Sequence, residues 1–164
     1  MSHPPSDDAP STAWFDVFEI QEGAHRGCIH DRALAVRACR AVLKLVKSHA
    51  VRAVVDAYTD YRKLMPPDAE AAEQVLWTIG KQQHRRDPGM NVELDLSCAE
   101  GWDLLDRCAP WSINVDVYDV EGDEIVNFHD CGLLVTARLT VDQAAKLATD
   151  LSDALHVEKR DEPH

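Results

Sequence analysis

The stretch that decides the fold covers residues 111–155 and reads WSINVDVYDVEGDEIVNFHDCGLLVTARLTVDQAAKLATDLSDAL. Apolar and polar residues alternate over residues 112–120, and further strand-like runs follow over residues 125–128 and 133–139. A turn that contains a glycine separates each run from the next. Because alternation of period two between such turns is typical of neighbouring antiparallel strands, the three runs predict a meander.

A helix is predicted directly after the meander. Thr140 and Gln143 have the spacing of a capping box, in which two side chains bind free backbone N–H groups at a helix start. Beyond them, apolar residues recur at helical spacing and form one stripe, made of Ala144, Leu147, Ala148, Leu151 and Leu155. A helix with one apolar side must cover a sheet face, so we expect it to pack on the meander.

The part of the chain before residue 111 alternates between strand-like and helix-like segments. Strands are predicted over residues 14–20 and 91–96, and a helix is predicted over residues 31–47 with Asp31 as its N-cap. The apolar residues then change phase, so this helix must end. Residues 50–57 form either a strand, which their β-branched side chains favour, or a new helix.

Two further helices complete the pattern. One is predicted over residues 69–83, after two prolines and Asp68. The other is short, opens with a capping box formed by Ser97 and Glu100, and stops before Pro110. The order of elements predicts an α+β fold, in which about four helices back one sheet that ends in the antiparallel three-strand meander. A mixed α/β sheet, parallel in its first half, is the alternative.

Length and composition predict one domain over residues 13–157, with a disordered tail over 1–12 and a charged tail over 158–164. The 164 residues are 45% hydrophobic, which is enough to bury a core. No apolar run approaches the length that spans a bilayer, and the first residues lack the pattern of a secretory signal. The five cysteines are an odd number without the spacing of a disulfide scaffold, so we expect a reduced, cytoplasmic protein.

Nearly all of the net charge of −12 lies in about a quarter of the chain. Residues 87–130 hold twelve carboxylates and one arginine, a sum of −11, whereas residues 1–64 sum to +1. The negative electrostatic field of such a segment repels nucleic acid and membrane surfaces. It attracts a basic protein and accelerates its association. The alternative is that the acidic groups only keep the protein soluble.

We therefore predict a partner-binding surface on the meander. Its expected residues are aromatic or polar and lie within the acidic segment: Trp111, Asn114, Asp116, Tyr118, Asp119, Glu121, Asp123 and Glu124. Aromatic rings surrounded by carboxylates suit an interface with a basic protein. Inhibitors, antitoxins and immunity proteins cover the cationic cleft of a nuclease or deaminase in this way. Trp111 and Trp102 have the alternative of packing in the core.

The second hypothesis is a small metal-dependent enzyme. Two groups of imidazole and thiol side chains suit zinc or another divalent cation: His25, Cys28 and His30 in one segment, and His129 with Cys131 in another. Cys28 or Cys131 would also serve as a nucleophile beside a histidine. No Cys-x-x-Cys or His-Glu-x-x-His motif accompanies these residues, and the two groups need not meet.

Two weaker patterns remain. If the first three strands were parallel neighbours, their carboxyl ends would bring together Glu22, His25, Asp56 and Asp95, a set able to hold a cation or transfer protons. The helix over residues 31–47 also carries a basic stripe opposite its apolar side: Arg37, Arg40, Lys44 and Lys47. This stripe either binds phosphates or is simply solvated. The glycine-rich loops that cradle phosphates are absent from the sequence.

Overall fold

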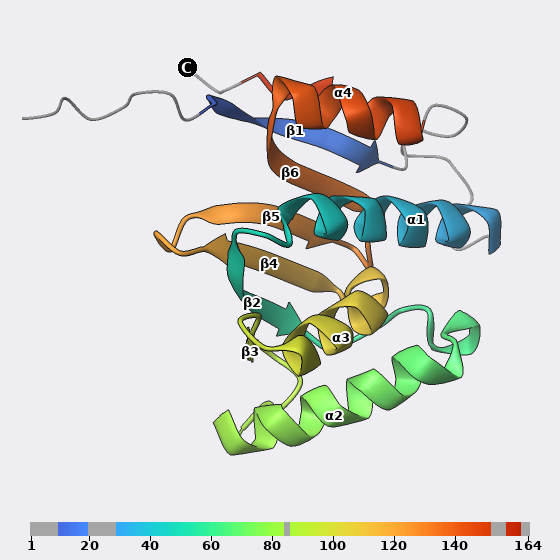
Figure 1. Ribbon diagram of the computed structural model, residues 1–164. Helices are drawn as coiled ribbons and strands as arrows, with labels where there is room; N and C mark the ends of the chain where they lie inside the picture. The colour runs from blue at the N-terminus through green and yellow to red at the C-terminus, as the bar shows by residue number, and fades with distance from the viewer. Residues whose placement is uncertain (1–9, 20–28, 84–85, 152–156, 162–164) are drawn as a thin grey trace, which may run out of the picture.

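The computed structural model describes residues 10–19, 29–83, 86–151 and 157–161. In this part of the chain, one seven-stranded sheet has the strand order β3-β2-β4-β5-β6-β1-β7 (Figure 1). Its strands are β1 (Thr12–Glu19), β2 (Ala50–Asp56), β3 (Val92–Asp95), β4 (Asn114–Asp119), β5 (Glu124–His129), β6 (Leu134–Thr140) and β7 (Glu158–Lys159). Strands β4 to β6 form the meander, so the predicted α+β fold is confirmed.

The helices cover one face of this sheet. They are α1 (Ile29–Val46), α2 (Pro67–Gln83), α3 (Ala99–Cys108) and α4 (Val141–Asp150), with short 3-10 turns η1 (Arg62–Leu64) and η2 (Ala109–Trp111). Figure 1 shows α1, α3 and α4 in front of the strands, and α2 packs against α3. A cross-strand row formed by Val115, Phe128 and Val135 is fully buried beneath the helices and marks the core.

The opposite face of the sheet is polar at its centre. The row next to the apolar one joins Asp116 on β4, Asn127 on β5 and Thr136 on β6. Because successive side chains of a strand point to opposite faces, these residues lie on the face away from the helices. None of the helices in the described ranges covers this face, which we call the open face.

The sheet contains no parallel pair among the described strands, so the alternative of a parallel first half is wrong. Residues 50–57 do form a strand, β2, but it pairs antiparallel with β3 and β4. Strand β1 lies far from β2 and pairs with β6 instead. Apolar periodicity is a local property and carries no information on which distant strands will pair.

Three of the four predicted helix starts differ from the structure and one is confirmed. Helix α2 begins at Pro67, so Asp68 lies in its first turn. Helix α1 begins at Ile29, before Asp31, so Asp31 is not its N-cap. Helix α3 has Cys98 as N-cap, and the Cys98 side chain makes no capping hydrogen bond. The predicted box fails because the Ser97 hydroxyl donates to the Asp95 carboxylate over 2.6 Å. The box before α4 forms as predicted, since Thr140 Oγ1 accepts from Gln143 N at 3.1 Å and Gln143 Oε1 accepts from Thr140 N at 2.9 Å.

Both edges of the sheet are partly covered. At one edge, the side-chain amide of Gln83 accepts from Glu93 N at 2.9 Å and donates to Glu93 O at 3.0 Å, which occupies two backbone groups of the edge strand. At the other edge, β7 pairs with β1, and Arg160 N donates to Trp14 O at 2.9 Å. Part of the expected charged tail therefore belongs to the sheet.

No helix in the described part of the chain is both long enough and apolar enough to cross a membrane.

Candidate functional site

The predicted partner surface maps mainly onto one hairpin, which we call the acidic hairpin and define as residues 114–129. It consists of β4, β5 and the turn between them. Five carboxylates lie along it: Asp116, Asp119, Glu121, Asp123 and Glu124. One of them occupies the open face of the sheet and four surround the turn, so the hairpin gathers much of the negative charge of the acidic segment.

Asp116 at the centre of the open face is held in a fixed position. Its Oδ2 accepts from Asn114 Nδ2 at 3.0 Å, and its Oδ1 accepts from Asn127 Nδ2 at 2.5 Å. All three side chains are half-buried. Carboxylates keep spare acceptor positions after two such bonds, so Asp116 can still accept from a further donor outside the sheet.

Tyr118 and Glu124 form the neighbouring cross-strand pair. Burial raises the pKa of the Tyr118 phenol, and the Asp116 and Glu124 charges raise it further. Partial burial also raises the pKa of the Glu124 carboxyl, with Asp116 adding to the effect and His129 opposing it. A cation brought to this pair by a partner would reverse that shift, because it stabilises the ionised form.

Arg52 borders this region on the adjacent strand β2. Its guanidinium lies 4.1 Å from the centre of the Tyr118 ring, and its Nη1 is 3.6 Å from the Glu93 carboxylate. The side chain therefore stacks on one face of the Tyr118 ring.

The carboxylates around the turn differ in what they contact. Asp119 Oδ1 accepts from Asp123 N at 2.9 Å and closes the turn, in which Gly122 has a φ of +87°. The Asp123 carboxylate is 3.4 Å from Arg138 Nη1. Glu121 and Glu124 are exposed and neither closes the turn. The sequence did not distinguish these roles, and the two glutamates are exposed carboxylates that the turn does not use.

Trp111 does not belong to this surface. Its ring is 6% exposed and packs with Met65 and Ala69 in a small cluster beside η2. The burial of Trp111 favours its alternative role in the core over its predicted use as an interface anchor. Trp102, by contrast, is only partly buried on α3.

The predicted metal ligands are only partly described. His25 and Cys28 lie outside the described residues, and so does the side chain of His30. His129 is exposed at the end of β5, whereas Cys131 is buried in the following turn. Among the described residues, no group of three or more potential ligands is present. Burial raises the pKa of the Cys131 thiol, which disfavours the reactive thiolate there. The metal hypothesis and the Cys28 nucleophile stay predictions.

The carboxylate cluster expected at one sheet edge does not form. Asp56 pairs across the sheet with Asn114, while Asp95 pairs with Arg52, so the two carboxylates lie at opposite ends of the antiparallel β2–β3 pair. Each also serves the local backbone, since Asp56 Oδ1 accepts from Asn91 N and Asp95 Oδ1 accepts from Ser97 N. Glu22 and His25 lie outside the described residues.

A buried arginine is the main polar feature that sequence reasoning missed. Arg32 is 3% exposed, and its guanidinium lies 4.5 Å from the Tyr61 ring centre and 4.7 Å from that of Trp111. It donates to the backbone oxygens of Cys131 and Pro110, while its buried Nε has no hydrogen bond. Burial lowers its pKa. Arg32 lies at helical spacing from buried residues further along α1, and this spacing could have predicted that its side chain faces the core.

Arg32 contacts a backbone of unusual conformation. Asp130, Cys131 and Gly132 have φ values of 55°, 58° and 75°. Three consecutive residues in the left-handed region are costly for non-glycine residues, so surrounding contacts must hold them. The bond of 2.5 Å from Arg32 Nη1 to Cys131 O is one such contact. This cluster connects α1, η2 and the β5–β6 turn and explains why Arg32 is buried.

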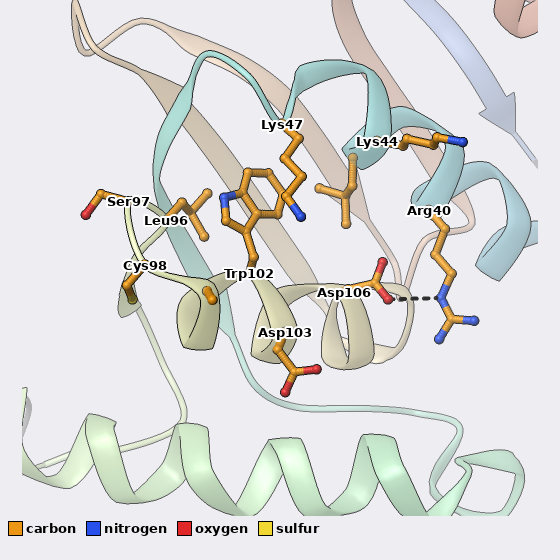
Figure 2. A pocket seen from close by; sticks show the side chains of 11 residues that line it. Arg40, Lys44, Lys47, Leu96, Ser97, Cys98, Trp102, Asp103 and Asp106 are labelled. Carbon is orange, nitrogen blue, oxygen red and sulfur yellow. Dashed lines mark ion pairs between the residues drawn. The ribbon is translucent and has the colours of Figure 1, made fainter.

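A cleft on the helix side is the second candidate site. It lies between α1 and α3 and has a volume of about 760 Å³ (Figure 2). Three residues of the predicted basic stripe line one wall: Arg40, Lys44 and Lys47. All three are exposed, as the spacing predicted. Trp102, Asp103 and Asp106 of α3 line the other wall.

Comparison of the chain with protein-family models, with curated proteins and with solved structures found no match in any of the three.

Proposed function

We propose that this chain is a small cytoplasmic partner-binding protein, which uses the acidic hairpin to cover a basic site on another protein. Its mode of action would be that of an inhibitor, antitoxin or immunity protein directed against a nuclease or deaminase. The observation that carries the proposal is the gathering of five carboxylates on one hairpin beside an open sheet face.

The chemistry of the proposed partner follows from these charges. A nuclease or deaminase cleft binds phosphates through arginine and lysine side chains. Carboxylates at the surface of an inhibitor can occupy the same cations, and Arg–carboxylate pairs are often bidentate. Glu121 and Glu124 are exposed for such contacts, while Asp116 offers a fixed carboxylate at the centre of the open face.

Rigidity supports the proposal. The Asp116 carboxylate is held by two amide groups, and Asp119 holds the turn through the backbone of Asp123. A surface whose side chains are already ordered loses less conformational entropy when it binds. Long-range attraction between opposite charges also increases the association rate, by an amount that salt reduces.

The test is a quantitative pull-down from the native cytoplasm with the tagged full chain and two double variants. Glu121→Lys with Glu124→Lys reverses the two available carboxylates. Glu70→Lys with Asp150→Lys is the matched control, since both residues are exposed, lie on helices outside the acidic hairpin and give the same change in net charge.

We expect wild type and control to retain the same basic protein, and we expect high salt to release it. The hairpin variant should retain less than about a tenth as much, because two repulsive charges replace two attractive ones. Equal retention by both variants, or the absence of any salt-sensitive basic partner, would contradict the proposal. Circular dichroism checks that each variant is folded.

A further inference from the structure

The cleft between α1 and α3 combines an apolar floor with a cationic wall. Leu43 and Leu96, both almost fully buried, form the floor. Figure 2 shows Trp102 reaching from α3 toward α1, with the Lys47 side chain beside its ring. The volume of about 760 Å³ is in the range of pockets that hold small organic molecules.

Lys47 and Trp102 form the centre of the cleft. The Lys47 Nζ atom lies 5.5 Å from the centre of the indole ring, a distance at which the ring attracts the cation. The ring itself is only partly buried, so part of its surface remains open to a ligand. One flat apolar surface and one positive charge are thus presented side by side.

The rest of the cationic wall is weakly neutralised. Arg40 Nε lies 3.7 Å from Asp106 Oδ2, and the two side chains are 45% and 52% exposed, so solvent screens their attraction. Lys44 is exposed, and no carboxylate of the described residues lies within 4.0 Å of its amine. An anion in the cleft would meet up to three cations, while Asp106 would compete with it for Arg40.

These observations favour one class of ligand. The indole surface suits a planar ring, which stacks on it with little dependence on its identity. The cations suit a doubly charged group more than a carboxylate, because several can approach a phosphate at once. A polymer such as nucleic acid is disfavoured, since the chain as a whole carries −12 charges and would repel it.

We propose that the cleft between α1 and α3 binds a small aromatic compound that carries a phosphate group, with the ring on Trp102 and the phosphate between Lys44 and Lys47. Arg40 contacts the phosphate when it leaves Asp106. This site is independent of the acidic hairpin and of the proposed partner, because it lies on the helix side of the sheet.

Isothermal titration calorimetry of the full chain tests this site with three probes. Adenosine monophosphate supplies both the ring and the phosphate, adenosine supplies the ring, and inorganic phosphate supplies the anion. We expect the monophosphate to bind at least about ten times more tightly than either other probe, because stacking and charge act together.

Three variants locate the binding. Lys47→Gln should weaken the monophosphate about fivefold, whereas Asp106→Asn should strengthen it about threefold by freeing Arg40 and removing a negative charge. The matched control is Lys81→Gln, which removes an exposed lysine of α2 outside the cleft and should change affinity by less than about twofold. A gain in affinity cannot come from misfolding, so Asp106→Asn keeps the test independent of stability.

Three results would overturn the inference. The first is no binding of the monophosphate at millimolar concentration. The second is equal affinity for inorganic phosphate, which would remove any role for the ring. The third is an equal effect of Lys47→Gln and Lys81→Gln, which would show that the monophosphate binds outside the cleft. Each result is independent of the pull-down with the acidic hairpin.

Discussion

The acidic hairpin and the α1–α3 cleft carry opposite charges and are built in different ways. In the hairpin, Asp116 and Asp119 are fixed by hydrogen bonds to side-chain amides and to the turn backbone. In the cleft, Lys44 on α1 and Lys47 directly after its end are exposed side chains. Hydrogen-bonded carboxylates therefore contribute to the stability of the fold, whereas exposed lysines add little to it.

The largest effect on stability is expected at the centre of the open face. Asp116→Leu removes the acceptor of two half-buried amide groups, those of Asn114 and Asn127. The Asn114 amide then loses this partner, and the Asn127 amide keeps only its 3.4 Å bond to Asn114 Oδ1, which should cost about 2 kcal/mol of the free energy of unfolding. Urea denaturation measures it, with Glu121→Leu as the control, for which we expect less than about 0.5 kcal/mol. Equal losses would mean that Asp116 is no more structural than Glu121.

The turn should show a smaller loss. Asp119→Ala removes the acceptor of the Asp123 backbone N–H and should cost about 1 kcal/mol. The same denaturation experiment measures it, and hydrogen exchange of the Asp123 amide reports the local opening. Unchanged exchange at this amide would show that the turn does not depend on Asp119.

The cleft cations should leave stability nearly unchanged. The double variant Lys44→Gln with Lys47→Gln removes two exposed charges, and we expect the free energy of unfolding to change by less than about 0.5 kcal/mol. If this variant were as destabilised as Asp116→Leu, the contrast between the two regions would be wrong.

The smallest effect is expected from pH at Glu124. Its folded pKa is raised above the unfolded value by burial and by Asp116, so ionisation of this group opposes folding. Stability should therefore rise slightly in the wild type as pH falls from above the folded pKa to below the unfolded pKa of about 4.3. Glu124→Gln should remove this increment, which thermal unfolding across that window measures. An identical pH profile of stability in both proteins would contradict the raised pKa of Glu124.

Local structure was accessible from the sequence because it depends on neighbouring residues. The three strands of the meander and the Thr140 capping box are encoded within a few positions, and both are present. The box at Ser97 failed because Asp95, two residues earlier, binds the same hydroxyl. A spacing rule does not include such competition between side chains.

Features that join distant segments were not accessible. The pairing of β1 with β6 brings together residues more than a hundred positions apart. Arg32 likewise meets Pro110 and Cys131, which lie 78 and 99 positions away, only through the tertiary fold. In the acidic hairpin, the sequence identified the carboxylates but not their hydrogen bonds, so it did not separate structural Asp119 from exposed Glu121. The cleft was not predicted because it forms where two helices pack together, and apolar periodicity does not indicate which helices will pack.

The most direct test of the central claim is the dissociation constant of the isolated basic partner, measured at low and at high salt for wild type and both double variants. The account predicts that wild type and the Glu70→Lys with Asp150→Lys control bind tightly and lose affinity steeply with salt. It predicts that Glu121→Lys with Glu124→Lys binds weakly, with a much smaller salt dependence. Equal affinities and equal salt dependences in all three proteins would contradict the assignment of the acidic hairpin as the binding surface.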